Sequence, residues 1–193
     1  IEDIPPQAVK TGALGTSSIV DAVAEQAAQF NCPLVVDPVM ISKHGLPLIA
    51  EEAKAAVIAR LIPRAFLVTP NIPEAEALTG LGIHSEEDMT TAARRLLEFG
   101  CRAVLVKGGH RESSDAVDVL VTGSLIQRFS RPRLQTRNTH GTGCTFSAAI
   151  TACLAKGLDI VAAIASAKQY IQAAIETALP LGRGIGPLNH FAR

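Results

Sequence analysis

The sequence has 193 residues, of which 48% are hydrophobic, and it carries 18 basic and 18 acidic side chains. That length allows one domain with a substantial core, and the zero formal net charge argues against a nucleic-acid or membrane-surface partner. No apolar run is long enough to span a bilayer, and the four cysteines lie in or beside apolar segments without metal-ligand spacing, so we expect free thiols in a cytoplasmic protein.

The first part of the chain alternates short apolar runs with helical patterns. Four runs predict buried strands, at residues 8–12, 34–36, 66–69 and 103–106. Apolar residues at helical spacing predict a helix that Ser17 or Ser18 caps, and further helices that start near residue 51, near residue 74 and at Ser85. Ser85 and Asp88 form a capping-box pattern at the start of the last of these helices.

The pattern changes near residue 117. Residues 117–121 and 125–129 predict a hairpin around Thr122-Gly123-Ser124, and two helices follow the loop at residues 138–144. Residues 182–187 hold three glycines and a proline, which predicts a loop. This order of strands and helices predicts a single three-layer α/β/α domain, with a mainly parallel central sheet and a β-hairpin near one edge.

In such a sheet, ligands bind beyond the carboxyl ends of the strands. Polar residues occur at five of these positions, and they are Lys10, Asp37, Asn71 with Glu74, Lys107, and the glycine loop with Cys144. Their convergence on one edge of the sheet favours an enzyme.

The loop at residues 138–144 opens a helix and has the character of an anion site. Gly141 and Gly143 allow positive φ angles and leave room for a ligand, and the first-turn N–H groups add partial positive charge. Cys144 stands at the same helix end, where a thiol pKa is lowered, so it is a candidate base or nucleophile. The alternative is a flexible helix cap with an inert buried cysteine.

The other candidates also have structural interpretations. Asp37 before proline could form a turn, and Glu74 could favour a helix N-terminus or bind the magnesium of a nucleotide. Lys107 could be a solvated charge or could reach a phosphate through a glycine-lined approach. Lys168, on the last long helix, has the pattern of a surface lysine.

Five segments carry a resemblance to a known family. They are DPVM (37–40), TPNIPEAE (69–76), VKGGH (106–110), NTHGTGC (138–144) and GPLNH (186–190). Together and in this order, they resemble the hydroxymethylpyrimidine/phosphomethylpyrimidine kinases of thiamine biosynthesis, in the ribokinase-like superfamily. The likeness runs from about Asp3 to the end. It implies a homodimer that uses ATP and Mg²⁺ to phosphorylate 4-amino-5-hydroxymethyl-2-methylpyrimidine and then its monophosphate, giving the diphosphate.

The resemblance also implies roles for individual residues. Cys144 takes the position where many sugar-kinase relatives have an aspartate base, and the amides of Gly141, Thr142, Gly143 and Cys144 would form the anion hole. The residues implied to contact the nucleotide or its metal are Lys107, Thr139, Lys168, Asn71, Glu74 and Asp37, the last two as the metal-side carboxylates. Those implied to line the pyrimidine pocket are Gly12, Ala13 and Val39. Family members often have methionine where Ala13 stands, so we expect a looser wall.

The front of the family pattern is not in this sequence. Members begin with a strand, a glycine-rich segment and a glutamine-containing strand, which supply much of the pyrimidine recognition. We therefore interpret residues 1–193 as one ribokinase-like domain that lacks its N-terminal portion, and we expect the function of the parent enzyme. The alternatives are a pyridoxal-type vitamin kinase and a non-catalytic pyrimidine-binding remnant. A thiol hydrolase is disfavoured, because no His and Asn or Asp pair is placed to activate Cys144.

Overall fold

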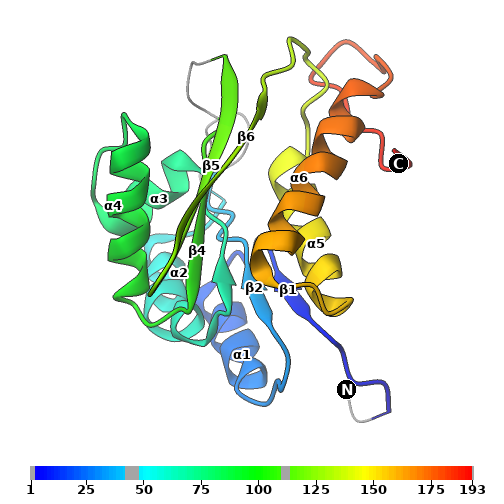
Figure 1. Cartoon of the computed structure of the whole chain (residues 1–193). Helices are drawn as coiled ribbons and strands as arrows, with labels where there is room; N and C mark the ends of the chain where they lie inside the picture. The colour runs from blue at the N-terminus through cyan, green and yellow to red at the C-terminus, as the bar shows by residue number, and fades with distance from the viewer. Residues whose placement is uncertain (1–2, 42–47, 110–113, 193) are drawn as a thin grey trace.

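The computed structural model describes residues 3–41, 48–109 and 114–192, and His110 of the VKGGH segment lies outside these ranges. In the described residues, a six-stranded sheet has its strands in chain order (Figure 1). The strands are β1 (Val9–Thr11), β2 (Leu34–Val36), β3 (Leu67–Val68), β4 (Ala103–Lys107), β5 (Asp115–Thr122) and β6 (Ile126–Pro132). The first four are parallel, whereas β5 and β6 form an antiparallel hairpin at one edge. The predicted α/β fold with an edge hairpin is confirmed.

Helices cover both faces of the sheet (Figure 1). One face carries α1 (Ser17–Ala27), α2 (Glu51–Ala56), α3 (Ile72–Thr79) and α4 (Glu86–Leu97), and the other carries α5 (Thr142–Ala155) and α6 (Ile160–Glu176). The helix predicted near residues 51–61 changes its hydrogen bonding halfway, since α2 continues as a π-helix over Val57–Leu61 and a 3₁₀ turn over Ile62–Arg64. Within the described residues, every helix is too short or too polar to cross a bilayer.

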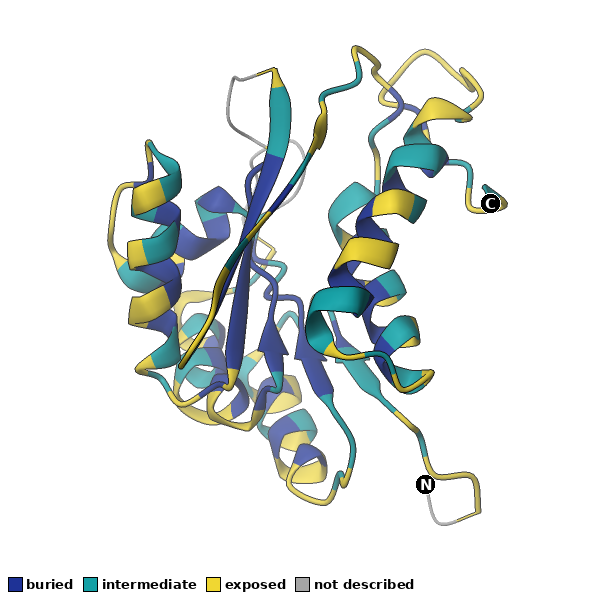
Figure 2. Ribbon diagram, in the orientation of Figure 1, coloured by how far each residue is buried: buried dark blue, intermediate teal, exposed yellow. Residues whose placement is uncertain are grey.

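The pleat of each strand decides which residues can reach the site. In β4, Val104 and Val106 pack on the α1–α4 side, while Ala103 and Leu105 pack on the α5–α6 side. Lys107 continues the second set and therefore extends toward α5. Figure 2 shows these strands dark blue between helices whose outer faces are yellow. The same alternation, after Val35 in β2 and before Leu120 in β5, sends Asp37 and Asp118 to the α5–α6 side.

The helix starts follow the expected chemistry with one difference. At α4, Ser85 Oγ accepts a hydrogen bond from the Asp88 amide at 3.0 Å, and Asp88 Oδ2 accepts one from the Ser85 amide at 2.9 Å, which confirms the predicted capping box. At α1, the prediction of Ser17 or Ser18 as the cap is wrong. Thr16 is the N-cap, because its backbone is extended and its Oγ1 accepts from the Ile19 amide at 3.4 Å.

Gly108 is required by the contact between β4 and β5. The sequence suggested that the glycines after Lys107 let the backbone approach a phosphate. In the structure, a Cβ on Gly108 would lie 1.9 Å from the carbonyl oxygen of Val117, whereas a Cβ on Gly109 would meet no atom within 4 Å. Gly108 therefore lets the hairpin pack against the end of β4.

This contact predicts unequal effects for two neighbouring substitutions. Gly108→Ala should lower the free energy of unfolding by about 1–3 kcal/mol or more, because the methyl group overpacks against backbone that cannot move away cheaply. Gly109→Ala, the matched control, should change it by less than about 0.5 kcal/mol. Urea unfolding measures both, and equal midpoints for the two variants would contradict the assignment.

Candidate active site

Asp37 is the centre of a polar cluster at the carboxyl ends of the parallel strands. The residue follows β2 and is 1% exposed. Its Oδ1 accepts hydrogen bonds from Lys107 Nζ at 2.8 Å and Thr69 Oγ1 at 3.3 Å, and its Oδ2 accepts one from Ser147 Oγ at 2.8 Å. Lys10 Nζ lies 3.6 Å from Oδ2. Side chains in or next to β1, β3, β4 and α5 thus contact the Asp37 carboxylate. The alternative role of Asp37 as a simple turn former does not account for these contacts.

The start of α5 lies beside this cluster and leaves backbone N–H groups without an acceptor in the described residues. Gly141 is the N-cap of α5, with a φ angle of 82°. Since glycine has no side chain, this helix start has no side-chain capping hydrogen bond. The Thr142 amide donates to the Thr139 carbonyl oxygen at 3.4 Å, so this member of the predicted anion hole is already engaged. Among the described residues, the amides of Gly143 and Cys144 have no backbone acceptor. These two amides are the ones available to an anion.

Lys107 lies against this helix end. A Cβ on Gly143 would be 3.2 Å from Lys107 Nζ, so glycine at this position allows the ammonium group to contact the first turn of α5. The side chain of Lys107 is 9% exposed and paired with Asp37. The alternative of a solvated lysine is therefore wrong. The ammonium groups of Lys107 and Lys10 lie near the start of α5, where they add to the partial positive charge of the helix N-terminus and favour an anionic ligand.

Cys144 is exposed at the third position of α5, so it is not the inert buried cysteine of the alternative interpretation. Although the residue as a whole is exposed, surrounding protein atoms partly desolvate the thiol and raise its pKa above the ordinary value. The Asp37 carboxylate raises the pKa further, and the ammonium groups of Lys10 and Lys107 oppose the shift only in part. The pKa of Cys144 is therefore raised, first by burial and then by the nearby carboxylates, opposite to the lowering predicted from its place at the helix start.

Asn71 and Glu74 form a reciprocal cap at the start of α3. Glu74 Oε2 accepts from the Asn71 amide at 2.8 Å, and Asn71 Oδ1 accepts from the Glu74 amide at 2.9 Å. These two hydrogen bonds support the interpretation of Glu74 as a residue that stabilises a helix start. Asn71 also forms a parallel β-bridge with Lys107, which places the start of α3 beside the Asp37 cluster. Burial raises the pKa of the Glu74 carboxyl, and the charge of Lys107 offsets this only in part.

The same carboxylates allow a test of the implied metal. The described residues contain no group of three or more His, Cys, Asp or Glu that could hold an ion by themselves. Magnesium that arrives with a nucleotide needs only one or two carboxylates, because phosphates and waters complete its octahedral shell. Asp37 and Glu74 influence one another electrostatically at one edge of the sheet. They fit a nucleotide-borne ion and do not fit a closed protein site.

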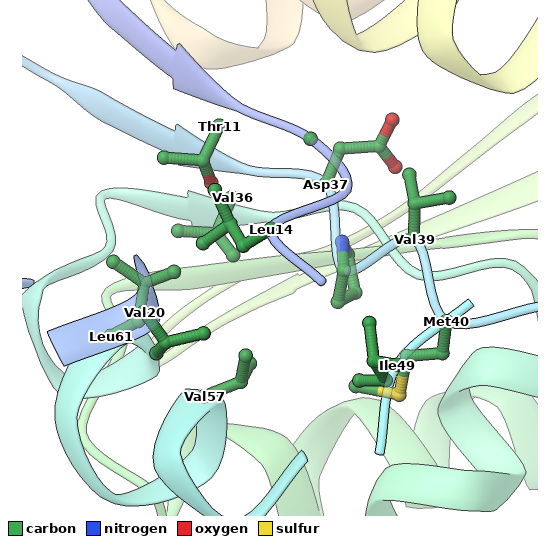
Figure 3. Close-up of a pocket in the computed structure, with 12 residues that line it drawn as sticks. Thr11, Leu14, Val20, Val36, Asp37, Val39, Met40, Ile49, Val57 and Leu61 are labelled. Atoms are coloured by element: carbon green, nitrogen blue, oxygen red, sulfur yellow. The ribbon is translucent and has the colours of Figure 1, made fainter. Parts of the chain in front are cut away.

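Gly12 and Val39 line one cavity below Asp37, on the α1–α2 side of the sheet (Figure 3). The cavity is apolar and has a volume of about 10 Å³, roughly the space of one water molecule. In Figure 3, the Asp37 carboxylate points away from the apolar side chains that surround the cavity. Ala13 is exposed and does not line it. The cavity alone does not enclose a pyrimidine ring, so the roles of these three residues stay predictions.

The loop before α5 is held by a segment far along the chain. The His140 amide donates to the Gly186 carbonyl oxygen at 3.0 Å, and His140 bridges to Pro187. A Cβ on Gly186 would lie 2.1 Å from Asn138 Oδ1, so glycine is needed for this approach. The predicted loop at residues 182–187 thus holds residues 138–140, which include Thr139.

Lys168 lies apart from the Asp37 cluster and is buried, so its assignment as a surface lysine is wrong. The sheet-facing side of α6 packs on the hairpin, and Lys168 Nζ donates to Asp118 Oδ2 at 2.5 Å and to the Ala116 carbonyl oxygen at 2.8 Å. Its contact with a nucleotide phosphate stays a prediction.

Three residues that the sequence analysis did not single out prove important. Ser147 and Thr69 hold Asp37, and Asp118 holds Lys168. Ser147 falls three residues after Cys144, so it could have been placed one helical turn from the thiol. Asp118 interrupts the apolar run at residues 117–121, and a charge inside a buried strand indicates a partner.

Comparison with known proteins fixes the family. The model of the family described as phosphomethylpyrimidine kinase matches residues 1–189. A hydroxymethylpyrimidine/phosphomethylpyrimidine kinase of Streptomyces coelicolor is 47% identical over 98% of this chain and 70% of its own length. The chain belongs to the phosphomethylpyrimidine kinase family. The predicted resemblance is confirmed.

The chain spans only part of the length of the relatives that it matches. The thiamine biosynthesis bifunctional protein ThiED of Geobacter sulfurreducens is 52% identical over 98% of this chain, which spans 39% of that protein's length. Among solved structures, phosphomethylpyrimidine kinase from Clostridium difficile is similar with a TM-score of 0.79 and 43% sequence identity. The match covers 90% of this chain and 71% of the Clostridium difficile chain. A pyridoxal kinase from Staphylococcus aureus, in complex with AMP-PCP and pyridoxal, has a TM-score of 0.91 at 36% sequence identity. This match covers 98% of this chain and 69% of the pyridoxal kinase chain. The ribokinase-like fold of phosphomethylpyrimidine kinases is thus confirmed for this chain.

The buried Glu74 predicts a pH-dependent stability. Its folded pKa is raised, so its contribution to stability is present below the ordinary value near 4.5 and is lost as pH rises through the folded pKa. Glu74→Gln keeps a capping side chain without the buried charge. Its free energy of unfolding relative to the wild type should therefore be higher at pH 8 than at pH 4.

Urea unfolding at the two pH values measures this difference. The exposed carboxylate of Glu52 provides the control, because Glu52→Gln should show a smaller pH-dependent difference. A constant gap between Glu74→Gln and the wild type would show that the carboxyl is not desolvated.

Proposed function

We propose that the protein uses ATP to phosphorylate 4-amino-5-hydroxymethyl-2-methylpyrimidine and then its monophosphate, giving the diphosphate. The observation that carries the proposal is the contact of Lys107 with the first turn of α5, where Cys144 is exposed and two amides are available. Phosphoryl transfer depends mainly on positioning and on charge stabilisation, and this arrangement provides both. Family membership selects the pyrimidine alcohol as the substrate class.

Different residues of this chain have separate roles in the phosphoryl transfer. The substrate hydroxyl oxygen attacks the γ-phosphorus of ATP, the bond to the bridging oxygen of ADP breaks, and the Cys144 thiolate accepts the hydroxyl proton. Lys107 and the amides of Gly143 and Cys144 stabilise the charge on the transferring group. Thr139, at the start of the same loop, supports the nucleotide phosphates.

The chemistry that a nucleotide-borne magnesium ion would supply here is neutralisation of phosphate charge. Glu74 and Asp37 would hold the ion, directly or through water, with Asn71 beside them. Asp37 is already bonded to three donors, so water-mediated contact suits it best. Gly12, Ala13 and Val39 would border the pyrimidine. We also propose a cytoplasmic homodimer with small-molecule substrates and no nucleic-acid partner, in keeping with the balanced charge and the four free cysteines.

A pyridoxal-type kinase is the second candidate, favoured by the structural likeness to the pyridoxal kinase of Staphylococcus aureus. The test is an ATP-dependent assay of the full-length protein with hydroxymethylpyrimidine, its monophosphate and pyridoxal side by side. We expect the highest kcat/KM for the two pyrimidines. A higher kcat/KM for pyridoxal would overturn the proposal in favour of the second candidate, and phosphorylation of none of the three would leave a non-catalytic role.

The raised pKa of Cys144 predicts the pH dependence of turnover. Only the thiolate can accept a proton, so kcat should rise with pH through the range 7–9, toward the thiol pKa, which lies above its ordinary value near 9.0. Cys144→Ala should lose roughly 10²-fold or more in kcat, in line with general-base contributions. Cys144→Asp should keep some activity with a flatter profile, since aspartate is ionised throughout this range.

Cys153, half-buried on the same helix, provides the matched control. Cys153→Ala should retain the turnover and the pH profile of the wild type. If Cys144→Ala also retains both, the thiol is only a helix-end residue and the base lies elsewhere.

A further inference from the structure

Asp118 and Lys168 form a second buried ion pair, outside the Asp37 cluster. The side chains of Asp118 and Lys168 are 5% and 8% exposed. Asp118 Oδ2 accepts from Lys168 Nζ, and its Oδ1 accepts from the Gly108 amide at 3.0 Å. Lys168 Nζ also donates to the Ala116 carbonyl oxygen and lies 5.9 Å from the ring centre of Phe146. Both oxygens of Asp118 and the ammonium group of Lys168 are thus occupied.

This pair adjoins the phosphate site through the antiparallel register. Lys107 and Asp118 are direct cross-strand partners in β4 and β5, and both belong to the α5–α6 side of the sheet. Lys107 nevertheless pairs with Asp37, at the carboxyl end of β2. Two buried carboxylates therefore lie within reach of Lys107, and its ammonium group occupies only one of them.

Electrostatic interactions explain why Lys107 pairs with the carboxylate of Asp37 and not with that of Asp118. An unpaired buried carboxylate is strongly unfavourable and attracts the nearest cation. Lys168 supplies that cation to Asp118, so Lys107 remains with Asp37. Burial raises the pKa of the Asp118 carboxyl, and Lys168 opposes this more strongly than Lys107 does. Lys168 is thus the main counter-charge of Asp118, with Lys107 second.

We propose that Lys168 is a positioning residue, which neutralises Asp118 and thereby keeps Lys107 paired with Asp37 against the first turn of α5. The proposal rests on the proposed function, because Lys107 is taken to act on the nucleotide phosphates. It assigns Lys168 an indirect role in place of the direct phosphate contact implied by the family resemblance.

The decisive variant neutralises both members of the pair. In Asp118→Asn with Lys168→Met, the asparagine oxygen can still accept from the Gly108 amide, and no buried charge remains at position 118 to compete with Asp37 for Lys107. We expect this double variant to retain kcat/KM for ATP within a few-fold of the wild type. Lys168→Met alone leaves Asp118 uncompensated, and we expect about a 10²-fold loss in kcat/KM, the scale of an active-site misplacement.

The alternatives give different results. If Lys168 contacts a phosphate directly, the double variant should be as impaired as Lys168→Met, which overturns the proposal. If the pair serves stability only, Lys168→Met should lower Tm but keep the kinetic constants of the wild type, which also overturns it. Should Lys168→Met fail to fold, the double variant still decides between an indirect role and direct contact.

Binding of AMP-PCP, measured by calorimetry, separates this proposal from the proposed function. We expect Lys168→Met to weaken it tenfold or more and the double variant to restore it, whichever alcohol the enzyme phosphorylates. Arg128→Met provides the control, because it removes the exposed ion pair with Glu86 and should leave AMP-PCP affinity unchanged. Equal AMP-PCP affinity in Lys168→Met and the wild type would overturn the positioning role.

Discussion

The structure depends on the burial of one carboxylate, Asp37, at the point where the parallel strands end. A buried charge is tolerated only with hydrogen bonds and counter-charges, and Asp37 obtains them from β1, β3, β4 and α5. These elements are distant in sequence, so the carboxylate fixes their relative positions as well as its own. The same contacts hold Lys107 against the helix end where an anion can bind. Stability and ligand binding therefore rely on the same atoms.

Much of the fold could be predicted from the sequence, because strand pairing in this sheet follows chain order. Short apolar runs that end at glycine or proline marked the strands, and the positions of Asp37 and Lys107 after strands predicted that both lie at one edge of the sheet. The capping box at Ser85 was visible because its two residues are local in sequence. The candidate site was likewise predicted from residues at strand ends and from the glycine loop before α5.

Long-range contacts were beyond sequence reasoning. Ser147 bonds Asp37 across 110 positions, and no local pattern reports such a pairing. The raised pKa of Cys144 depends first on burial of the thiol and then on the carboxylate of Asp37, and both arise only in the folded chain. Lys168 resembled a surface residue because helical spacing shows which face is apolar, but it does not reveal a buried acid opposite that face. The change from α- to π-helix after Ala56 had no signal in composition.

The attachment of residues 186–187 to the loop before α5 has a consequence for biosynthesis. A ribosome releases the chain from its N-terminus, so β1 to β6 and α5 can all emerge before Gly186 and Pro187 exist. Until then, the loop that bears Thr139 and His140 lacks its backbone partner. A nascent chain can thus assemble its sheet and its Asp37 cluster while the loop that bears Thr139 and His140 is still without this support. That loop gains its backbone partner only after Gly186 and Pro187 have left the ribosome.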